Sequence, residues 1–338
     1  MITLRLHGVR DVRVHDEDVS EPAAGEVPLR ITAVGLCGSD LHWYAEGAIG
    51  ETSLERPLVL GHEFAGVIAD GPRAGERVTV DPAIPCGECD SCRRGNEHLC
   101  VAGRFAGHGA TDGALRQALA WPERLVHPVP DTLSDAEAAL LEPLAVAVHA
   151  VDLARIEPGA TAGVHGCGPL GLLVLQLLRR RGVEVVATDP LPHRAEAAEA
   201  LGAGRSLATS RADGRELLPS GAAGADVTFD VSGDDDARAT AIDVVRPGGT
   251  VVVVGIPSHD RSAFVASTAR RKELTLVLCR RMRGEDLPRA VEVAALRQVE
   301  LASLVTERFP LQDGATAFEA LADRRGLKVI VEPQQQAT

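Results

Sequence analysis

The stretch of residues 161–171 reads Thr-Ala-Gly-Val-His-Gly-Cys-Gly-Pro-Leu-Gly and limits the possible folds of this chain more than any other stretch. It places three glycines at the spacing G-x-G-x-x-G, between a short apolar run and a helix-forming segment at residues 172–181. In such a turn the first glycine permits a tight bend, the second lets the backbone approach a pyrophosphate, and the third lets helix and strand pack closely. The start of the helix adds unpaired N–H groups and a dipole that favour phosphate. The pattern predicts a strand, a turn and a helix that bind a dinucleotide through Gly166, Gly168, Pro169, Leu170 and Gly171.

An acidic residue stands where a dinucleotide site needs one. A second apolar run, residues 183–188, ends in Asp189, which follows Gly166 by about 20 residues, the usual distance to the acid of such sites. A carboxylate there accepts hydrogen bonds from the adenosine ribose and repels a 2′-phosphate, so NAD is favoured over NADP. The alternative is that Asp189 caps the helix that begins near Pro190. We expect the ribose role, because strand, turn, helix and second strand are all present.

Length and composition describe a globular protein with two domains. The chain has 338 residues, of which 45% are hydrophobic and 25% are charged. Its net charge of −13 argues against a nucleic-acid partner, because phosphate binding needs a basic surface. No apolar run approaches the ~20 residues of a membrane span, and the N-terminus lacks the apolar core of a signal peptide. We therefore expect a cytoplasmic protein with no nucleic-acid or membrane partner.

Four of the seven cysteines lie close together, at the spacing C-x2-C-x2-C-x7-C. Glycine, asparagine and aspartate between them supply the turns that let four thiolates surround one tetrahedral zinc ion. With four protein ligands, no position remains for water, so this zinc would be structural. An iron–sulfur cluster is the competing metal. Disulfides would need an oxidising compartment, for which the sequence gives no sign. The predicted ligands are Cys86, Cys89, Cys92 and Cys100.

Further residues of metal-ligand type are scattered along the chain. Cys37, His62 and Glu63 supply a thiol, an imidazole and a carboxylate, but only the fold can bring them together. Glu142 lies in an otherwise apolar stretch, where a buried carboxylate needs a partner and a cation suits it. An acid at the start of a helix, just before Pro143, is the alternative.

The two halves of the chain differ in their predicted secondary structure. Before about residue 150, short alternating runs such as residues 27–34 and 116–120 predict strands of an antiparallel or barrel-like sheet. Ser134 and Glu137 have the spacing of a capping box and predict the start of a helix. Later in the chain, strands alternate with helices, which predicts a parallel sheet covered on both faces. The strands expected there include residues 225–231, 249–255 and 274–279, and the helices include residues 194–202, 235–245, 285–296 and 313–321.

Together these motifs resemble the zinc-dependent medium-chain dehydrogenases, and the resemblance runs nearly from end to end. Their order is Cys37-x-Ser39-x-x-His42, Gly61-His62-Glu63, the four cysteines, Glu142-Pro143 and the glycine turn. Within that family the chain is most similar to the polyol branch, the sorbitol- and xylitol-type dehydrogenases. The resemblance implies an α/β protein, with a Rossmann-type doubly wound parallel sheet (residues 149–280) inserted in a GroES-like, mostly-β catalytic domain (residues 1–148 and 281–338).

The resemblance also implies the metal ligands. Cys37 and His62 match ligands of a catalytic zinc ion, and Glu63 matches the carboxylate ligand of the polyol enzymes. Glu142 matches a position that either binds this zinc or holds its water. The four clustered cysteines would hold a second, structural zinc ion. Two zinc ions per chain are expected.

Other matched positions concern the proton, the substrate and the cofactor. Ser39 and His42 match a proton relay, in which the Ser39 hydroxyl takes the proton of the alcohol. Tyr44 and Arg281 are expected to contact the substrate, and Arg194 to contact the cofactor together with Asp189. The chain departs from the polyol branch at Glu307, where that branch usually has histidine, and in the aromatic pair after His42.

The predicted activity is hydride transfer from a secondary alcohol (a polyol, sugar alcohol or cyclitol) to NAD, giving a ketone. Threonine-type amino-alcohol oxidation is the alternative among enzymes. A protein that only binds zinc and a nucleotide has no need of Ser39, His42 and Glu142. A zinc-free quinone reductase is disfavoured by Cys37 and the four clustered cysteines. The resemblance also implies a homo-oligomer, a dimer or a tetramer.

Overall fold

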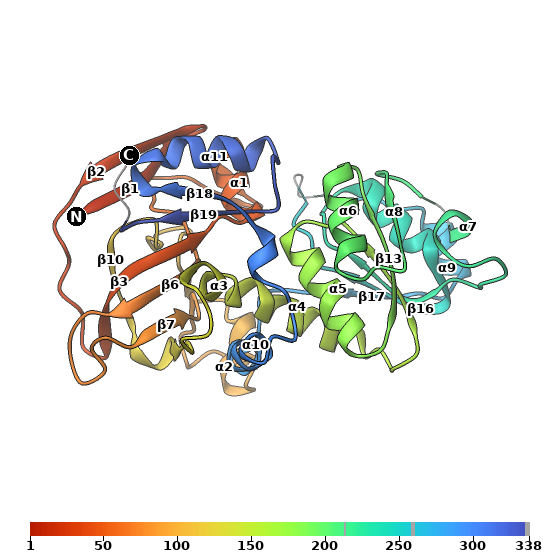
Figure 1. The fold of residues 1–338 in the computed structure, drawn as a ribbon, viewed down its shortest axis with the longest axis horizontal. Coiled ribbons are helices and arrows are strands. Elements are labelled where there is room, and N and C mark those ends of the chain that lie inside the picture. The colour runs from red at the N-terminus through yellow and green to blue at the C-terminus, as the bar shows by residue number, and fades with distance from the viewer. Residues whose placement is uncertain (213, 258–260, 335–338) are drawn as a thin grey trace. The chain divides into compact units, whose positions relative to one another are not determined.

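The computed structural model describes residues 1–212, 214–257 and 261–334, and the chain divides into two units (Figure 1). The first unit comprises Met1–Glu142, Arg283–Arg297 and Leu301–Thr338, and the second comprises Pro143–Met282 and Gln298–Glu300. The chain passes between them inside one helix, α4 (Leu141–Ala154), so the boundary expected after residue 148 falls within this helix.

The first unit is built on a seven-stranded sheet. Its strands lie in the order β11-β7-β6-β3-β19-β18, with β10 also paired to β3. These strands are β3 (Glu26–Gly35), β6 (Glu63–Ile68), β7 (Arg77–Val80), β10 (Ala118–Pro122), β11 (Val126–Pro128), β18 (Val305–Pro310) and β19 (Lys328–Glu332). Because β19 pairs with β3, the last part of the chain completes a sheet that begins near the N-terminus.

Short elements surround this sheet. A hairpin and two small ladders are formed by β1 (Ile2–Gly8), β2 (Asp11–Asp16), β4 (Ala48–Ile49), β5 (Thr52–Ser53), β8 (Ala83–Ile84) and β9 (Arg104–Phe105). The helices are α1 (Gly38–Glu46), α2 (Asp90–Arg93), α3 (Asp135–Ala139), α10 (Asp286–Ala295) and α11 (Gly314–Ala322). Single 3₁₀ turns lie at Glu97–Leu99, Glu123–Leu125, Ala302–Leu304 and Leu311–Asp313.

One apolar core fills the first unit. Phe64 and Phe318 are fully buried, and Trp43 and Trp121 are nearly so. Two aromatic contacts lie within this core, Phe64 with Trp121 and Tyr44 with Phe318. The predicted capping box is confirmed at α3, where the Glu137 carboxylate accepts a hydrogen bond from the Ser134 N–H at 2.8 Å.

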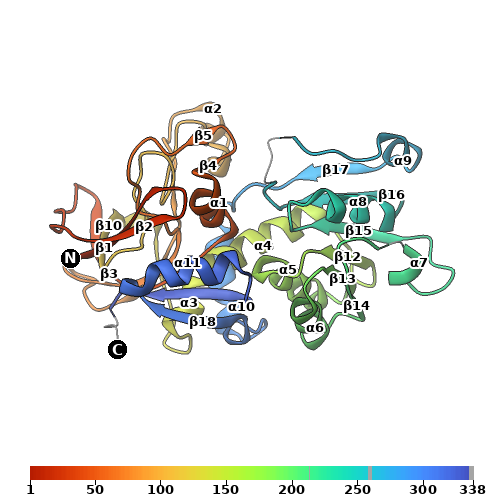
Figure 2. The same cartoon turned by 90° about the horizontal axis from the view of Figure 1, so that it is seen from above.

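The second unit is a six-stranded, fully parallel sheet in the order β14-β13-β12-β15-β16-β17. Numbered from the first strand, this is the order 3-2-1-4-5-6 of a dinucleotide-binding fold, which confirms the predicted fold class. Figure 2 shows β17 at one edge of this sheet. The strands are β12 (Thr161–His165), β13 (Glu184–Asp189), β14 (Arg205–Ala208), β15 (Ala225–Asp230), β16 (Val245–Val253) and β17 (Thr275–Leu278).

Helices connect the parallel strands. They are α5 (Pro169–Arg180), α6 (Pro192–Ala200), α7 (Gly214–Leu217), α8 (Asp235–Val244) and α9 (Ala266–Arg271), while α4 precedes the first strand of the sheet. The helices predicted after the glycine turn, after Asp189 and at residues 235–245, 285–296 and 313–321 are confirmed. Glu142 lies in the first turn of α4, as its alternative role expected, whereas α1 and α9 were not predicted. Among the helices of the described residues, none has the length and apolar character needed to cross a membrane.

Candidate functional site

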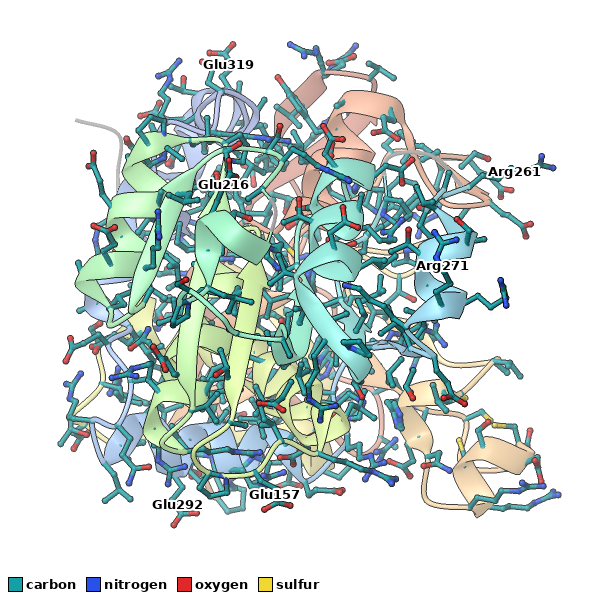
Figure 3. The ribbon with its side chains drawn as sticks, turned by 90° about the vertical axis from the view of Figure 1, so that its right-hand side faces the viewer. Glu157, Glu216, Arg261, Arg271, Glu292 and Glu319 are labelled. Atoms are coloured by element: carbon teal, nitrogen blue, oxygen red, sulfur yellow. The ribbon has the colours of Figure 1, made fainter. Side chains whose placement is uncertain are left out.

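The four predicted zinc cysteines meet in a lobe that contains α2, where sulfur atoms cluster in Figure 3. The Sγ atom of Cys92 lies 3.5 Å from that of Cys89 and 4.0 Å from that of Cys86, and Cys89 and Cys100 are 3.8 Å apart. Four sulfurs placed tetrahedrally at Zn–S ≈ 2.3 Å are about 3.8 Å from one another. The spacing of these sulfur atoms therefore fits one zinc ion.

Backbone donors prepare the same sulfurs for a metal. The N–H of Cys86 donates to Cys100 Sγ and that of Cys89 to Cys86 Sγ, both at 3.3 Å. The N–H of Cys92 lowers the pKa of the Cys89 thiol to about 6. Thiolate is the form that binds zinc, so these donors favour the metal-binding state.

A second group of ligand type joins Cys37, His62 and Glu63, whose ligand atoms all lie within 4.8 Å of one another. Cys37 caps the start of α1, directly after β3, while Glu63 begins β6. The antiparallel register of β3 and β6 pairs Gly35 with Glu63, which brings the two segments together. Thiolate, imidazole and carboxylate are all zinc ligands, so this donor set fits a zinc ion held by three protein groups.

Asp40, which the sequence analysis did not single out, supports this group from within the core. Its carboxylate accepts a hydrogen bond from the Cys37 N–H at 3.0 Å and lies 3.6 Å from His62 Nδ1. Burial would raise the pKa of this carboxyl, but the His62 ring and the N–H groups of Cys37 and Gly61 outweigh burial and lower it. Asp40 follows Cys37 by three positions, the spacing of a capping box, and this spacing is the signal that could have found it.

Ser39 lies beside the three-residue group. Its hydroxyl oxygen is 3.4 Å from His62 Nε2, the nitrogen on the opposite side of the ring from Asp40. The predicted relay partner His42 lies farther along α1, where its Nδ1 is 3.0 Å from the Glu46 carboxylate. Thus Ser39 lies at the candidate metal group, whereas His42 forms a hydrogen bond with Glu46.

Two further buried charged residues adjoin the same group. Lys328, from β19, forms an ion pair with the Glu63 carboxylate, and neither side chain is more than 3% exposed. Glu142, at the start of α4, is not among the three grouped ligands. Burial raises the pKa of Glu142 to about 8, and the charges of His62, Glu63 and Lys328 are the next influences on it. Lys328 was missed by the sequence analysis, because its partner lies 265 positions away in the chain.

The glycine turn of the second unit has the geometry that its spacing predicted. Gly166 has φ 101°, and a Cβ there would lie 2.9 Å from the Ser232 nitrogen. A Cβ on Gly171 would lie 1.9 Å from the Gly166 oxygen, so helix α5 packs directly on the turn. Gly168 precedes the first residue of α5, Pro169, and the atom nearest to a Cβ at Gly168 would be Arg194 Nη1 at 3.6 Å.

Asp189 ends β13 and is linked to this turn. Its Oδ2 accepts a hydrogen bond from the Cys167 N–H at 2.8 Å, and its Oδ1 accepts one from the Leu191 N–H at 2.9 Å. Helix α6 begins at Pro192 with Leu191 before it, so the alternative role of Asp189 as its N-cap is not what the structure shows. Each carboxylate oxygen keeps capacity for a further hydrogen bond.

The structure shows the surroundings of Tyr44 and the backbone conformation of Arg281, the two residues predicted to contact the substrate. Tyr44 is 4% exposed, and its ring stacks on that of Phe318 with centroids 5.0 Å apart, so it packs in the core of the first unit. Arg281, after β17, has φ 56°, a left-handed conformation that is unusual for a residue with a side chain. Their substrate contacts stay predictions.

Comparison with known proteins matches both units. Residues 23–131 match the alcohol dehydrogenase GroES-like domain, and residues 169–295 match the zinc-binding dehydrogenase domain. The chain is 33% identical to a sorbitol dehydrogenase of Bacillus subtilis, over 98% of this chain and 96% of that protein. It is 34% identical to a probable D-xylulose reductase A of Arthroderma otae, over 96% and 95%. The crystal structure of L-idonate 5-dehydrogenase from Escherichia coli matches with a TM-score of 0.90 and 28% identity, over 98% of this chain and 97% of that one.

Proposed function

The chain belongs to the zinc-dependent medium-chain dehydrogenases, and from that premise we propose that it oxidises a secondary hydroxyl group of a polyol, sugar alcohol or cyclitol to a ketone, with NAD as hydride acceptor. The observation that carries the proposal is the group of Cys37, His62 and Glu63. Three protein ligands leave one position of a tetrahedral zinc ion open for a substrate oxygen. The relatives named as acting on sorbitol, xylulose and idonate support a polyhydroxylated substrate.

Side chains of the first unit provide the proton chemistry in this proposal. When bound, zinc acts as a Lewis acid that lowers the pKa of an alcohol, and NAD accepts the hydride. The Ser39 hydroxyl, next to His62, takes the proton of the alcohol and passes it towards His42. Glu142 either joins the ligand set or orients water beside it. The four clustered cysteines hold a second, structural zinc ion.

The second unit binds the cofactor through its glycine turn. The unpaired N–H groups at the start of α5 receive the pyrophosphate. Asp189 binds the ribose and repels a 2′-phosphate, which supports NAD over NADP, and Arg194 lies beside Gly168 in the same region. We also propose that the protein is cytoplasmic, where its cysteine thiols would stay reduced.

A substrate panel tests the activity. Sorbitol, xylitol, aminocyclitols and threonine are each offered with NAD, and NADH formation is followed by absorbance. We expect turnover with polyols or cyclitols, loss of turnover when zinc is removed and its return when zinc is restored, with two zinc ions per chain. Turnover with threonine alone would assign the amino-alcohol alternative, and tight NAD binding without turnover of any alcohol would assign a binding protein.

We further propose that the chain forms a homo-oligomer through β17. This strand is at the edge of the parallel sheet, where unpaired N–H and C=O groups are available to another chain. Leu278 on this strand is 78% exposed, and Ile256, Phe264 and Val265 are further exposed apolar side chains of the same unit. Arg271, near β17 in the chain, extends outward from this unit (Figure 3).

Replacing Leu278 tests this interface. We expect Leu278→Arg to shift the protein towards the monomer, because a charge would have to be desolvated between two chains. Light scattering coupled to size-exclusion chromatography measures the mass in solution. Leu296→Arg is the matched control, since Leu296 is also exposed but belongs to the first unit. Equal masses for Leu278→Arg and the unmodified protein would exclude β17 from the interface.

A further inference from the structure

Lysine is rare in this chain, and one of its lysines is buried next to the candidate metal group. Only two of the 35 basic residues are lysines, Lys272 and Lys328, and all the others are arginines. Lys328 is 3% exposed and forms an ion pair with Glu63, one of the three grouped ligands. A buried cation requires a compensating partner, and the partner of Lys328 is itself a candidate metal ligand.

The backbone of β3 leaves room for the ion pair of Lys328 and Glu63. In the sheet, β3 lies between β6, which carries Glu63, and β19, which carries Lys328. The two side chains meet across β3 at Gly35, where a Cβ would lie 2.4 Å from Glu63 Oε2 and 2.9 Å from Lys328 Cε. The absence of a side chain at Gly35 thus leaves room for an ammonium group on a slender stem. The broader guanidinium of an arginine would crowd the same space.

The ion pair of Lys328 and Glu63 differs from an ordinary buried ion pair, because its acidic partner is also a candidate metal ligand. The Lys328 ammonium is buried and paired with the Glu63 carboxylate, and Glu63 shares the candidate metal group with Cys37 and His62. Zinc carries two positive charges, which the Cys37 thiolate and the Glu63 carboxylate would neutralise. Lys328 adds one positive charge to that set, at the oxygen of Glu63 with which it is paired.

We propose that Lys328 is a positioning residue that holds one carboxylate oxygen of Glu63 back from the metal and keeps the loaded site more positive. This inference rests on the proposed function, because it assumes that Cys37, His62 and Glu63 hold the catalytic zinc ion. A carboxylate restrained in this way offers the metal one oxygen, which leaves the open position to the alcohol. The extra positive charge favours loss of the proton of the alcohol.

The proposal predicts an unusual direction of change. In Lys328→Met the Glu63 carboxylate loses its buried counter-ion, and zinc becomes the cation that compensates it. Zinc affinity should therefore rise about tenfold, within the scale of changes that partners of metal ligands produce. If Lys328 only supported the position of Glu63 as a ligand, the same substitution would lower zinc affinity or leave it unchanged, and either result would overturn the proposal.

The experiment is a double-mutant cycle read by zinc affinity. Glu63→Gln, Lys328→Met and the double variant are titrated with zinc against a chromophoric chelator, and cobalt substitution reports the ligand geometry by absorbance. The control Lys272→Met removes the other lysine, which donates to the carbonyls of Ile242, Asp243 and Val245 in the second unit, and should leave zinc affinity unchanged.

Two comparisons within the cycle keep the proposal separate from the proposed function. Glu63→Gln should weaken zinc binding, and if it does not, the assigned metal site is itself wrong whatever Lys328→Met does. Glu63→Gln leaves Lys328 as an unpaired cation near the metal, so the double variant should bind zinc more tightly than Glu63→Gln. This comparison also serves if Lys328→Met alone does not fold, because the double variant buries no unpaired charge.

Discussion

Asp40 determines how His62 is presented to a metal. Its carboxylate accepts a hydrogen bond from the Cys37 N–H and lies next to His62 Nδ1, so that Nε2 faces the Ser39 hydroxyl. Asp40→Asn keeps the shape of the side chain but removes the charge that orients the ring. We expect zinc affinity at this site to fall about 10- to 100-fold. Competition with a chelator measures the zinc affinity. The control is Asp226→Asn in the second unit, where Asp226 accepts a hydrogen bond from the Thr161 N–H, and it should leave zinc affinity unchanged.

Asp189 combines two functions in one carboxylate. It fixes the glycine turn through Cys167 and the next loop through Leu191, and it is the proposed ribose ligand. We expect Asp189→Ala to weaken NAD binding by about 2 kcal/mol, the usual worth of hydrogen bonds to a charged group, and to weaken NADP binding less. Fluorescence titration with NADH and NADPH gives both affinities. An unchanged ratio of the two would show that Asp189 only organises the loops.

At the scale of elements, β12 carries a buried titratable group. His165 ends this strand with Nδ1 2.9 Å from Thr188 Oγ1, and burial lowers its pKa from the ordinary 6.5 to about 3. The unfolded chain binds a proton at higher pH than the folded one does. The stability that neutral His165 contributes is therefore present above pH 6.5 and is lost towards pH 3, by up to about 1.4 kcal/mol per pH unit.

Removing this group should flatten the acid sensitivity. His165→Leu cannot bind a proton, so we expect it to lose about 2 kcal/mol less stability than the unmodified protein between pH 6.5 and pH 4.5. Urea unfolding at the two pH values gives the difference for each protein. Equal losses in the two proteins would mean that His165 is not the group responsible.

The elements also show which structural features could be predicted from the sequence and which could not. The glycine turn and the four-cysteine lobe depend on residues close together in the chain, so their spacing was enough to predict them. Helix α1 was missed because its starting segment, Cys37-Gly-Ser-Asp, looks like a loop until Asp40 is seen to pair with the Cys37 N–H. The pair of Lys328 and Glu63 depends on the order of strands in a sheet, and no local pattern reports that order.

At the scale of the whole molecule, the two units differ in how their parts are distributed along the chain. All six strands of the second unit lie in one continuous segment, from β12 to β17. The first unit is discontinuous, because β18 and β19 come from the C-terminal part and β19 pairs with β3. A chain that ends before residue 300 therefore lacks two strands of its first sheet and the counter-ion of Glu63.

This difference predicts which fragment folds. We expect residues 141–282 to unfold cooperatively on heating and to bind NADH, because that segment contains the complete parallel sheet and the glycine turn. Residues 1–142 alone should show no cooperative transition, since the end of β3 at Val34 and Gly35 would lose its partner strand and Glu63 would carry an uncompensated charge. Circular dichroism and NADH fluorescence measure the two properties. Joining residues 1–142 to residues 283–338 through a Gly/Ser linker should restore the cooperative transition and zinc binding. If residues 1–142 by themselves unfolded cooperatively, β18 and β19 would be dispensable for this sheet.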